Sequence, residues 1–96
     1  MQPDPTPGTG DVWLDVVDAV EMPDPLRFAC LARRRLGVER YGTPLQYGNG
    51  RDPDADLLDE LLDGAVYAWQ GGRREMARDL LAMAAQVIDG VDTHDL

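Results

Sequence analysis

The segment from residue 53 to 70 constrains the fold of this chain most strongly, because its apolar residues recur with the period of a helix. Asp52-Pro53 supplies a helix cap followed by proline at the first helical position, and Gly71-Gly72 supplies a C-terminal stop. The spacing between these signals predicts an amphipathic helix over 53–70. Its apolar positions form one wide face: Leu57, Leu58, Leu61, Leu62, Ala65, Val66 and Trp69.

Three further segments show a helical period. The spacing of their apolar residues predicts helices over 11–22, 25–40 and 73–89. A second Asp-Pro pair, Asp24-Pro25, marks the start of the middle one. No segment alternates apolar and polar residues over a useful strand length. We therefore predict an all-α fold, a small four-helix bundle.

Glycine and proline divide the chain into one helical domain and two ends. Residues 1–10 hold three prolines and two glycines, which predicts a disordered leader. Residues 11–90 are expected to form a single helical domain, and residues 91–96 a flexible tail. Residues 41–52 have no sustained period and are predicted to be the loop between the second and third helices.

Charge and cysteine content exclude several classes of protein. The formal net charge is −9, and such a chain is repelled by phosphate backbones and anionic lipid. We expect no direct nucleic acid binding and no membrane binding, since no apolar run approaches the ~18 residues of a membrane span. The one cysteine, Cys30, excludes an intramolecular disulfide and a zinc knuckle. These features predict a cytoplasmic protein.

The apolar surface of the predicted helices exceeds what one small core can bury. A chain of 96 residues buries only a little over ~60% of its unfolded surface. The segments 53–70 and 73–89 both carry apolar arcs wider than the ~100° stripe that one packing surface requires. We therefore predict a homodimer, or a dimer of dimers, that completes the bundle with these two helices at the interface.

Four carboxylates share one face of the predicted 53–70 helix. Asp56, Asp59, Glu60 and Asp63 lie at i, i+3, i+4 and i+7, so their charges repel one another, and no arginine shares that face. A divalent cation would relieve the repulsion, and magnesium takes a few carboxylates together with waters and a substrate phosphate. The alternative is a solvated polar face on an acidic protein.

The loop that precedes this helix is a candidate phosphate site. Small residues let backbone N–H groups approach an anion, the helix N-terminus carries partial positive charge, and Arg51 offers a bidentate donor. Asn49, Gly50 and Arg51 are the predicted phosphate-binding residues. The alternative, which these residues alone favour, is a capping turn in which Asn49-Gly50 is left-handed, Asp52 caps the helix and Arg51 pairs with a nearby acid.

The segment Glu39–Gln70 resembles small bacteriophage-encoded proteins that combine Tyr-Gly, Pro-Leu and Asn-Gly-Arg-Asp with an acidic helix. More remotely, the helix is similar to the first acidic helix of MazG-like all-α nucleoside triphosphate pyrophosphatases, whose paired acids and next-turn acid bind magnesium. Asp59, Glu60 and Asp63 occupy those places. The family also uses an acid pair three residues apart on a second helix, whereas Glu75 and Asp79 here are four apart.

Two interpretations of function follow. In the first, the chain is a Mg²⁺-dependent, MazG-like nucleotide pyrophosphohydrolase or a nucleotide-binding relative. The resemblance implies Asp59, Glu60 and Asp63 as metal ligands, with Glu60 and Asp63 as the catalytic residues. Asp56, on the same face, or Glu75 would complete the metal shell. In the second, it is a non-catalytic, phage-encoded acidic protein whose carboxylates bind a basic host protein surface. For a phage protein, the expected compartment is the host cytoplasm.

Overall fold

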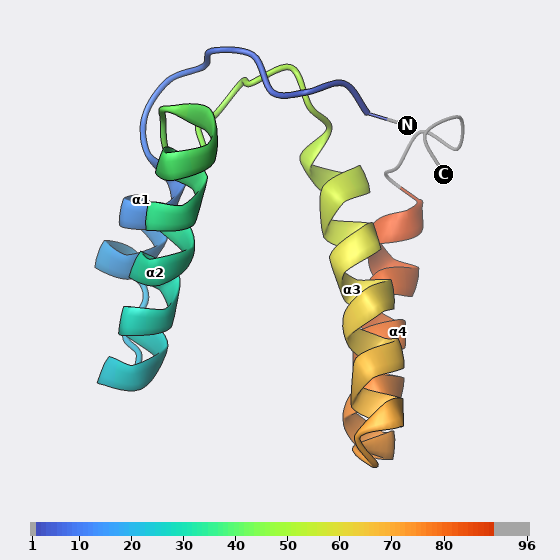
Figure 1. Cartoon of the computed structure of the whole chain (residues 1–96). Coiled ribbons are helices and arrows are strands. Elements are labelled where there is room, and N and C mark those ends of the chain that lie inside the picture. Colours follow the sequence, from blue (N-terminus) through green and yellow to red (C-terminus); the bar gives the residue numbers. More distant parts are fainter. Residues whose placement is uncertain (1, 90–96) are drawn as a thin grey trace. The chain divides into compact units, whose positions relative to one another are not determined.

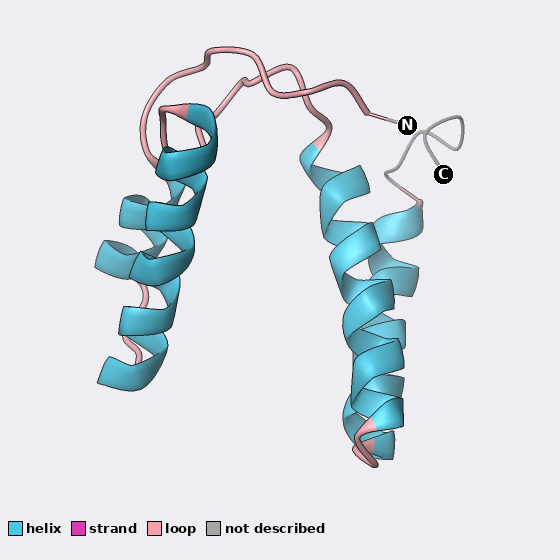
Figure 2. Ribbon diagram, viewed as in Figure 1, coloured by secondary structure: helices cyan, strands magenta, loops and turns pink. Residues whose placement is uncertain are grey.

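The computed structural model describes residues 2–89, which form four helices joined by loops (Figures 1 and 2). Within these residues, β pairing is confined to an isolated antiparallel bridge between Thr9 and Tyr47. The all-α, four-helix prediction is confirmed, and the predicted tail at 91–96 lies outside the described residues. The helices are α1 (Val12–Ala19), α2 (Asp24–Tyr41), α3 (Pro53–Gln70) and α4 (Arg74–Ile88).

Capping signals explain the helix ends. α3 has its predicted bounds, because the Asp52 side chain accepts hydrogen bonds from the backbone N–H groups of Asp54 and Ala55. α1 ends at Ala19, three residues before its predicted end. Val20 is already extended at φ −107° and ψ 121°, and the bulk of Pro23 disfavours helical backbone just before it.

The other two helices differ from prediction by one residue at each end. α2 begins at Asp24 rather than 25 and continues through Gly37 to Tyr41. It stops where Gly42 adopts the left-handed region at φ 81°, a conformation that glycine reaches without steric cost. α4 is shorter than the predicted 73–89 by one residue at each end.

The described residues divide into two compact units, one of residues 3–51 and a second of residue 2 with residues 52–89. We call these the N-terminal unit and the C-terminal unit. α1 packs against α2 in the first, and α3 packs against α4 in the second (Figure 1). The single domain predicted over 11–90 stays a prediction, as does packing of all four helices into one bundle.

Small residues form the contact between α3 and α4. Among the described residues of α3 and α4, Leu58 is the largest buried side chain, and it clusters with Ala55 and Ala84. Leu61 and Val87 pack against this cluster and are half-buried. The contact therefore uses only part of the predicted apolar arc. Its buried residues are Ala55, Leu58, Ala65 and Ala68 of α3 with Ala77 and Ala84 of α4.

The described part of the leader contacts the loop before α3, and its predicted disorder stays a prediction. Its backbone is extended and pairs with the loop before α3: Thr9 N donates to Tyr47 O at 3.0 Å, and Tyr47 N donates to Thr9 O at 2.8 Å. Thr6 N donates to Asn49 O at 2.8 Å. A Cβ on Gly8 would lie 2.0 Å from Tyr47 O, so glycine permits this close approach. The backbone groups of the leader thus find partners more than 35 residues away.

Candidate functional site

Four carboxylates of α3 lie on the side of the helix away from α4, and we call them the acidic stripe: Asp56, Asp59, Glu60 and Asp63. At 100° per residue, its centre is roughly opposite the buried side of the helix. Asp59, Glu60 and Asp63 are exposed, and within residues 2–89 the structure records no ion pair to any of them. Asp56 is half-buried, and its Oδ1 accepts a hydrogen bond from Gln2 Nε2 at 3.0 Å. Three carboxylates of α3 therefore face solvent.

The stripe does not by itself assemble a metal site. In the described part of the chain, no group of three or more His, Cys, Asp or Glu side chains is placed to hold a metal ion. Seven residues of helix separate Asp56 from Asp63, which is about 10 Å of axial rise, whereas magnesium ligands lie ~2.1 Å from one ion. Further ligands from water, substrate or another element would be required. The magnesium role of Asp56, Asp59, Glu60 and Asp63 stays a prediction.

The predicted phosphate loop forms a capping turn. Asn49 Oδ1 accepts from Arg51 N at 3.2 Å, and Gly50 has a left-handed φ of 81°. The guanidinium of Arg51 donates to the carbonyl of Pro3 in the leader. Asp52 caps α3 as described above. Gly50 is left-handed and Asp52 caps α3, as in the alternative weighed from the sequence, whereas Asn49 does not have a positive φ. The Pro3 carbonyl is one partner of Arg51.

Four backbone N–H groups around the start of α3 already have partners. Arg51 N is bonded to the Asn49 side chain, and Asp52 N is bonded to Gln2 Oε1. The N–H groups of Asp54 and Ala55, in the first turn of α3, have no acceptor within the helix and are bonded to the Asp52 carboxylate. A phosphate would have to displace these groups. The binding role of Asn49, Gly50 and Arg51 stays a prediction.

Gln2 is a residue that the sequence did not single out. Its Nε2 donates to Asp52 O at 2.9 Å and to the Asp56 carboxylate, while its Oε1 accepts from Asp52 N. One amide side chain therefore satisfies three groups at the start of α3. No local sequence pattern predicts this role, because it depends on contact between Gln2 and Asp52, which are 50 residues apart in the sequence.

A second polar cluster joins the two helices of the N-terminal unit. Asp11 caps α1 by accepting from Leu14 N at 3.1 Å, and it also binds Arg34 of α2 through Nε at 2.9 Å and Nη2 at 2.8 Å. The hydrogen bond from Arg34 is the main reason that the pKa of Asp11 lies below its ordinary value. These contacts leave no open site, so the cluster is structural.

Tyr47 makes a further polar contact within the N-terminal unit. Its hydroxyl donates to Asp15 Oδ2 at 2.7 Å. This hydrogen bond is the largest cause of a raised pKa at Tyr47, because the neighbouring carboxylate disfavours a second negative charge. The contact ties the loop before α3 to α1.

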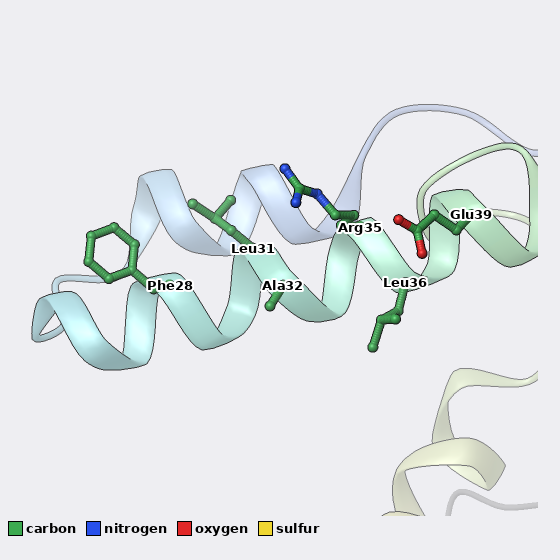
Figure 3. A pocket seen from close by; sticks show the side chains of 6 residues that line it. All are labelled: Phe28, Leu31, Ala32, Arg35, Leu36 and Glu39. Atoms are coloured by element: carbon green, nitrogen blue, oxygen red, sulfur yellow. The ribbon is translucent and has the colours of Figure 1, made fainter.

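α2 carries an open apolar hollow of about 440 Å³ along one side (Figure 3). Phe28 and Leu36 are 64% and 57% exposed, so the hollow is a surface feature rather than an enclosed cavity. Arg35 and Glu39 are its charged members. All of its lining residues come from this one helix: Phe28, Leu31, Ala32, Arg35, Leu36 and Glu39.

Comparisons with protein-family models, with curated proteins and with solved structures find no match to this chain. Among the described helices, none has the length and apolar character needed to cross a lipid bilayer.

Proposed function

We propose that this chain is a non-catalytic acidic interaction protein that binds a basic surface of a partner protein through α3. The observation that carries the proposal is the joint exposure of Asp59, Glu60 and Asp63, for which residues 2–89 supply no ion-pair partner. A phage-encoded chain in the host cytoplasm would meet such a basic surface on a host protein.

Electrostatics gives a physical reason for this choice. Carboxylates three and four residues apart on a helix repel one another by a few tenths of a kcal/mol per pair, and arginine or lysine from a partner would remove that cost. A net charge of −9 would also speed the encounter with a basic surface. Binding of this kind weakens as salt screens the charges.

A basic peptide provides the test. We would measure binding of a fluorescent, arginine-rich helical peptide by anisotropy at low and moderate salt. The stripe variant Asp59→Asn/Glu60→Gln/Asp63→Asn is expected to bind about tenfold more weakly, a loss of ~1.4 kcal/mol. The matched control, Asp4→Asn/Asp18→Asn/Glu21→Gln, removes the same charge from exposed positions elsewhere. Equal losses in both variants would show that overall charge, rather than the stripe, drives binding.

A second candidate is a Mg²⁺-dependent nucleoside triphosphate pyrophosphohydrolase of the MazG-like type. The same three carboxylates favour it, since an adjacent pair and a next-turn acid are free to take a cation. In this mechanism Asp59, Glu60 and Asp63 would hold a magnesium ion, which would supply Lewis-acid chemistry for the phosphates, and Arg51 and the loop amides would stabilise the developing charge. The occupied loop amides make this the weaker proposal.

Turnover separates the two candidates. An enzyme of this type converts a nucleoside triphosphate and water into the monophosphate and pyrophosphate, which chromatography detects directly. Magnesium-dependent turnover that is lost in Glu60→Gln and retained in Asp4→Asn would establish the enzyme. Absence of turnover in the parent chain would leave the interaction protein as the proposal that fits.

Self-association is the third part of the proposal. Large apolar side chains of α3 and α4 stay exposed after the two helices have packed, among them Leu62, Val66 and Leu81. Monomeric proteins rarely leave such residues in one contiguous patch. We propose a homodimer, or a dimer of dimers, in which α3 and α4 form the interface.

A further inference from the structure

The side of α2 that α1 leaves uncovered carries the apolar hollow described above (Figure 3). Arg34 fixes the orientation of α2, because its guanidinium binds Asp11 at the start of α1. At 100° per residue, Ala32 lies about 160° around the helix from Arg34. Phe28 and Leu36, four residues to either side of Ala32, share its face. We call these three residues the apolar row.

The apolar row has the shape of a helix-packing groove. Ala32 is a small side chain between two large ones, Phe28 and Leu36, which are 64% and 57% exposed. Rows of side chains spaced four apart are the ridges and grooves through which helices pack against one another. A second helix laid along α2 would place one of its side chains over Ala32. The hollow therefore suits a helix.

Arginine lies on both sides of the apolar row. Arg35 lies on one side, and Arg33 and Arg40 lie on the other. All three are exposed, and no ion pair to any of them is recorded within residues 2–89, although Arg40 lies over the ring of Tyr41. α2 contains five arginines against two acidic residues, whereas the whole chain has a net charge of −9. This face is therefore locally basic on an acidic protein.

We propose that this face of α2 binds an acidic amphipathic helix of a partner protein. The apolar residues of that helix would cover the apolar row, and its carboxylates would accept hydrogen bonds from the arginines on both sides. Apolar burial supplies affinity, and the arginines select acidic over basic flanks. The surface differs from the acidic stripe of α3 in its helix and in the sign of its charge, so the inference is independent of the function proposed above.

Glu39 favours a helix over an extended anionic surface. It is one of the residues that line the hollow, so an anionic lipid surface or a nucleic acid would bring negative charge against it. A helix can place a neutral or basic side chain at that one position and keep its carboxylates beside the arginines. A phosphate backbone would also leave Phe28 and Leu36 without an apolar partner.

A designed peptide tests the proposal on the full chain. The probe is a fluorescent helical peptide of about 20 residues whose leucines recur three and four apart, with glutamate at the flanking positions. We expect the parent to bind it with a Kd below ~100 μM by anisotropy at physiological salt, where long-range repulsion from the net charge is screened. The same peptide with glutamine in place of leucine is expected to show no saturation, because it has no apolar face to cover the apolar row.

A matched pair of charge reversals locates the site. Arg33→Glu/Arg35→Glu is expected to raise the Kd for the glutamate peptide at least tenfold. Arg73→Glu/Arg78→Glu reverses as much charge at exposed positions of the C-terminal unit and is expected to change the Kd by less than about twofold. Equal losses in both variants would show that overall charge controls binding and would overturn the proposal.

A pair of apolar variants and a check on folding complete the design. Leu36→Asp, in the apolar row, is expected to raise the Kd at least tenfold. Leu26→Asp, at an exposed position of the same helix outside the hollow, is expected to leave it unchanged. Circular dichroism confirms that each variant keeps its helices. Equal Kd values for the two variants would overturn the proposed face.

The remaining outcomes identify other occupants. Absence of saturable binding of the glutamate peptide to the folded parent would overturn the proposal. In that case, binding to phosphatidylserine vesicles that Arg33→Glu/Arg35→Glu abolishes would assign the face to lipid, and a change in mass in that variant would assign it to a second copy. The arginine-rich peptide of the stripe experiment is expected to bind the parent and the α2 variants alike. Failure with the glutamate peptide alone therefore leaves the function proposed above intact.

Discussion

At the residue scale, Asp11 combines two stabilising roles. It caps α1 through Leu14 N and forms the ion pair with Arg34 of α2. We expect Asp11→Ala to lower the free energy of unfolding by about 1–2 kcal/mol, because a lost N-cap costs ~1 kcal/mol and a partly exposed ion pair adds up to ~1 kcal/mol. Urea denaturation measures the loss. Asp18→Ala, at an exposed acid of the same helix, is the control and should change stability by much less.

The same carboxylate gives a pH dependence. Arg34 lowers the pKa of Asp11 below its ordinary value of 3.8, so the folded state holds this proton less tightly than the unfolded state. The stabilisation is complete above the unfolded pKa and is lost as the pH falls through the lower, folded pKa. We expect the unfolding free energy of Asp11→Asn to fall less steeply than that of the parent below about pH 5. Parallel pH profiles would contradict the assignment.

Tyr47 provides a spectroscopic readout. Because its hydroxyl already donates to Asp15, ionisation breaks a hydrogen bond and places two negative charges together. In a Tyr41→Phe/Tyr67→Phe background, absorbance titration should give a midpoint above 10.0, the ordinary pKa of tyrosine. Asp15→Asn should bring the midpoint back toward that value. An unchanged midpoint would show that the contact does not persist in solution.

At the scale of the elements, two glycines predict opposite effects. Gly37 lies inside α2 with nothing near the position of an added Cβ, so Gly37→Ala should stabilise the chain by roughly 0.5–1 kcal/mol. Gly50 has a φ of +81°, and a Cβ there would lie 2.7 Å from Thr6 Oγ1. Gly50→Ala should therefore destabilise by more than about 1 kcal/mol. Thermal unfolding of both variants checks the contrast, and an equal effect of the two would refute it.

We expect the carboxylates of the acidic stripe to contribute to binding without contributing to the stability of the fold. Glu60→Gln and Asp63→Asn each remove one charge from a repelling set, so the unfolding free energy should stay the same or rise by a few tenths of a kcal/mol. Denaturant titration with circular dichroism measures this. Unfolding of both variants would mean that the carboxylates are paired within the fold, and that neither proposed site is correct.

The sequence predicted those elements whose signals are local. α3 has its predicted bounds because Asp52, Pro53 and the glycines after Gln70 act within one turn of its ends. The end of α1 was predicted three residues late, since the backbone turns extended at Val20, ahead of Pro23. Pairing of the leader could not be predicted in the same way. It depends on Gly8 fitting against Tyr47, residues far apart in the chain.

The candidate site also has one part that the sequence could predict and one part that it could not. Helical period correctly brought Asp59, Glu60 and Asp63 onto one exposed stripe, because that follows from spacing alone. The loop before α3 was harder, since the same residues suit either a phosphate cradle or a capping turn. Arg51 donates to the Pro3 carbonyl, and Asp52 N donates to the Gln2 side chain. Gln2 and Pro3 belong to an N-terminal segment with no recognisable sequence pattern.

At the scale of the whole molecule, the proposed homodimer would cover apolar side chains of α3 and α4 that are exposed in one chain. We predict a mass two or four times the 10.6 kDa of one chain at micromolar concentration, by light scattering coupled to size exclusion. The net charge of −9 opposes association, but screening at physiological salt limits that repulsion to within about 8 Å. A mass of one chain under these conditions would rule out the dimer.

The central claim is that the carboxylates of α3 serve a basic protein partner rather than a magnesium–nucleotide complex. Calorimetric titration of the full chain with MgCl₂, alone and with a non-hydrolysable nucleoside triphosphate, tests it most directly. We predict no saturable binding in either titration, and the same baseline for the parent and for Glu60→Gln. Saturable, nucleotide-dependent magnesium binding in the parent that disappears in Glu60→Gln would contradict the claim and establish the metal site.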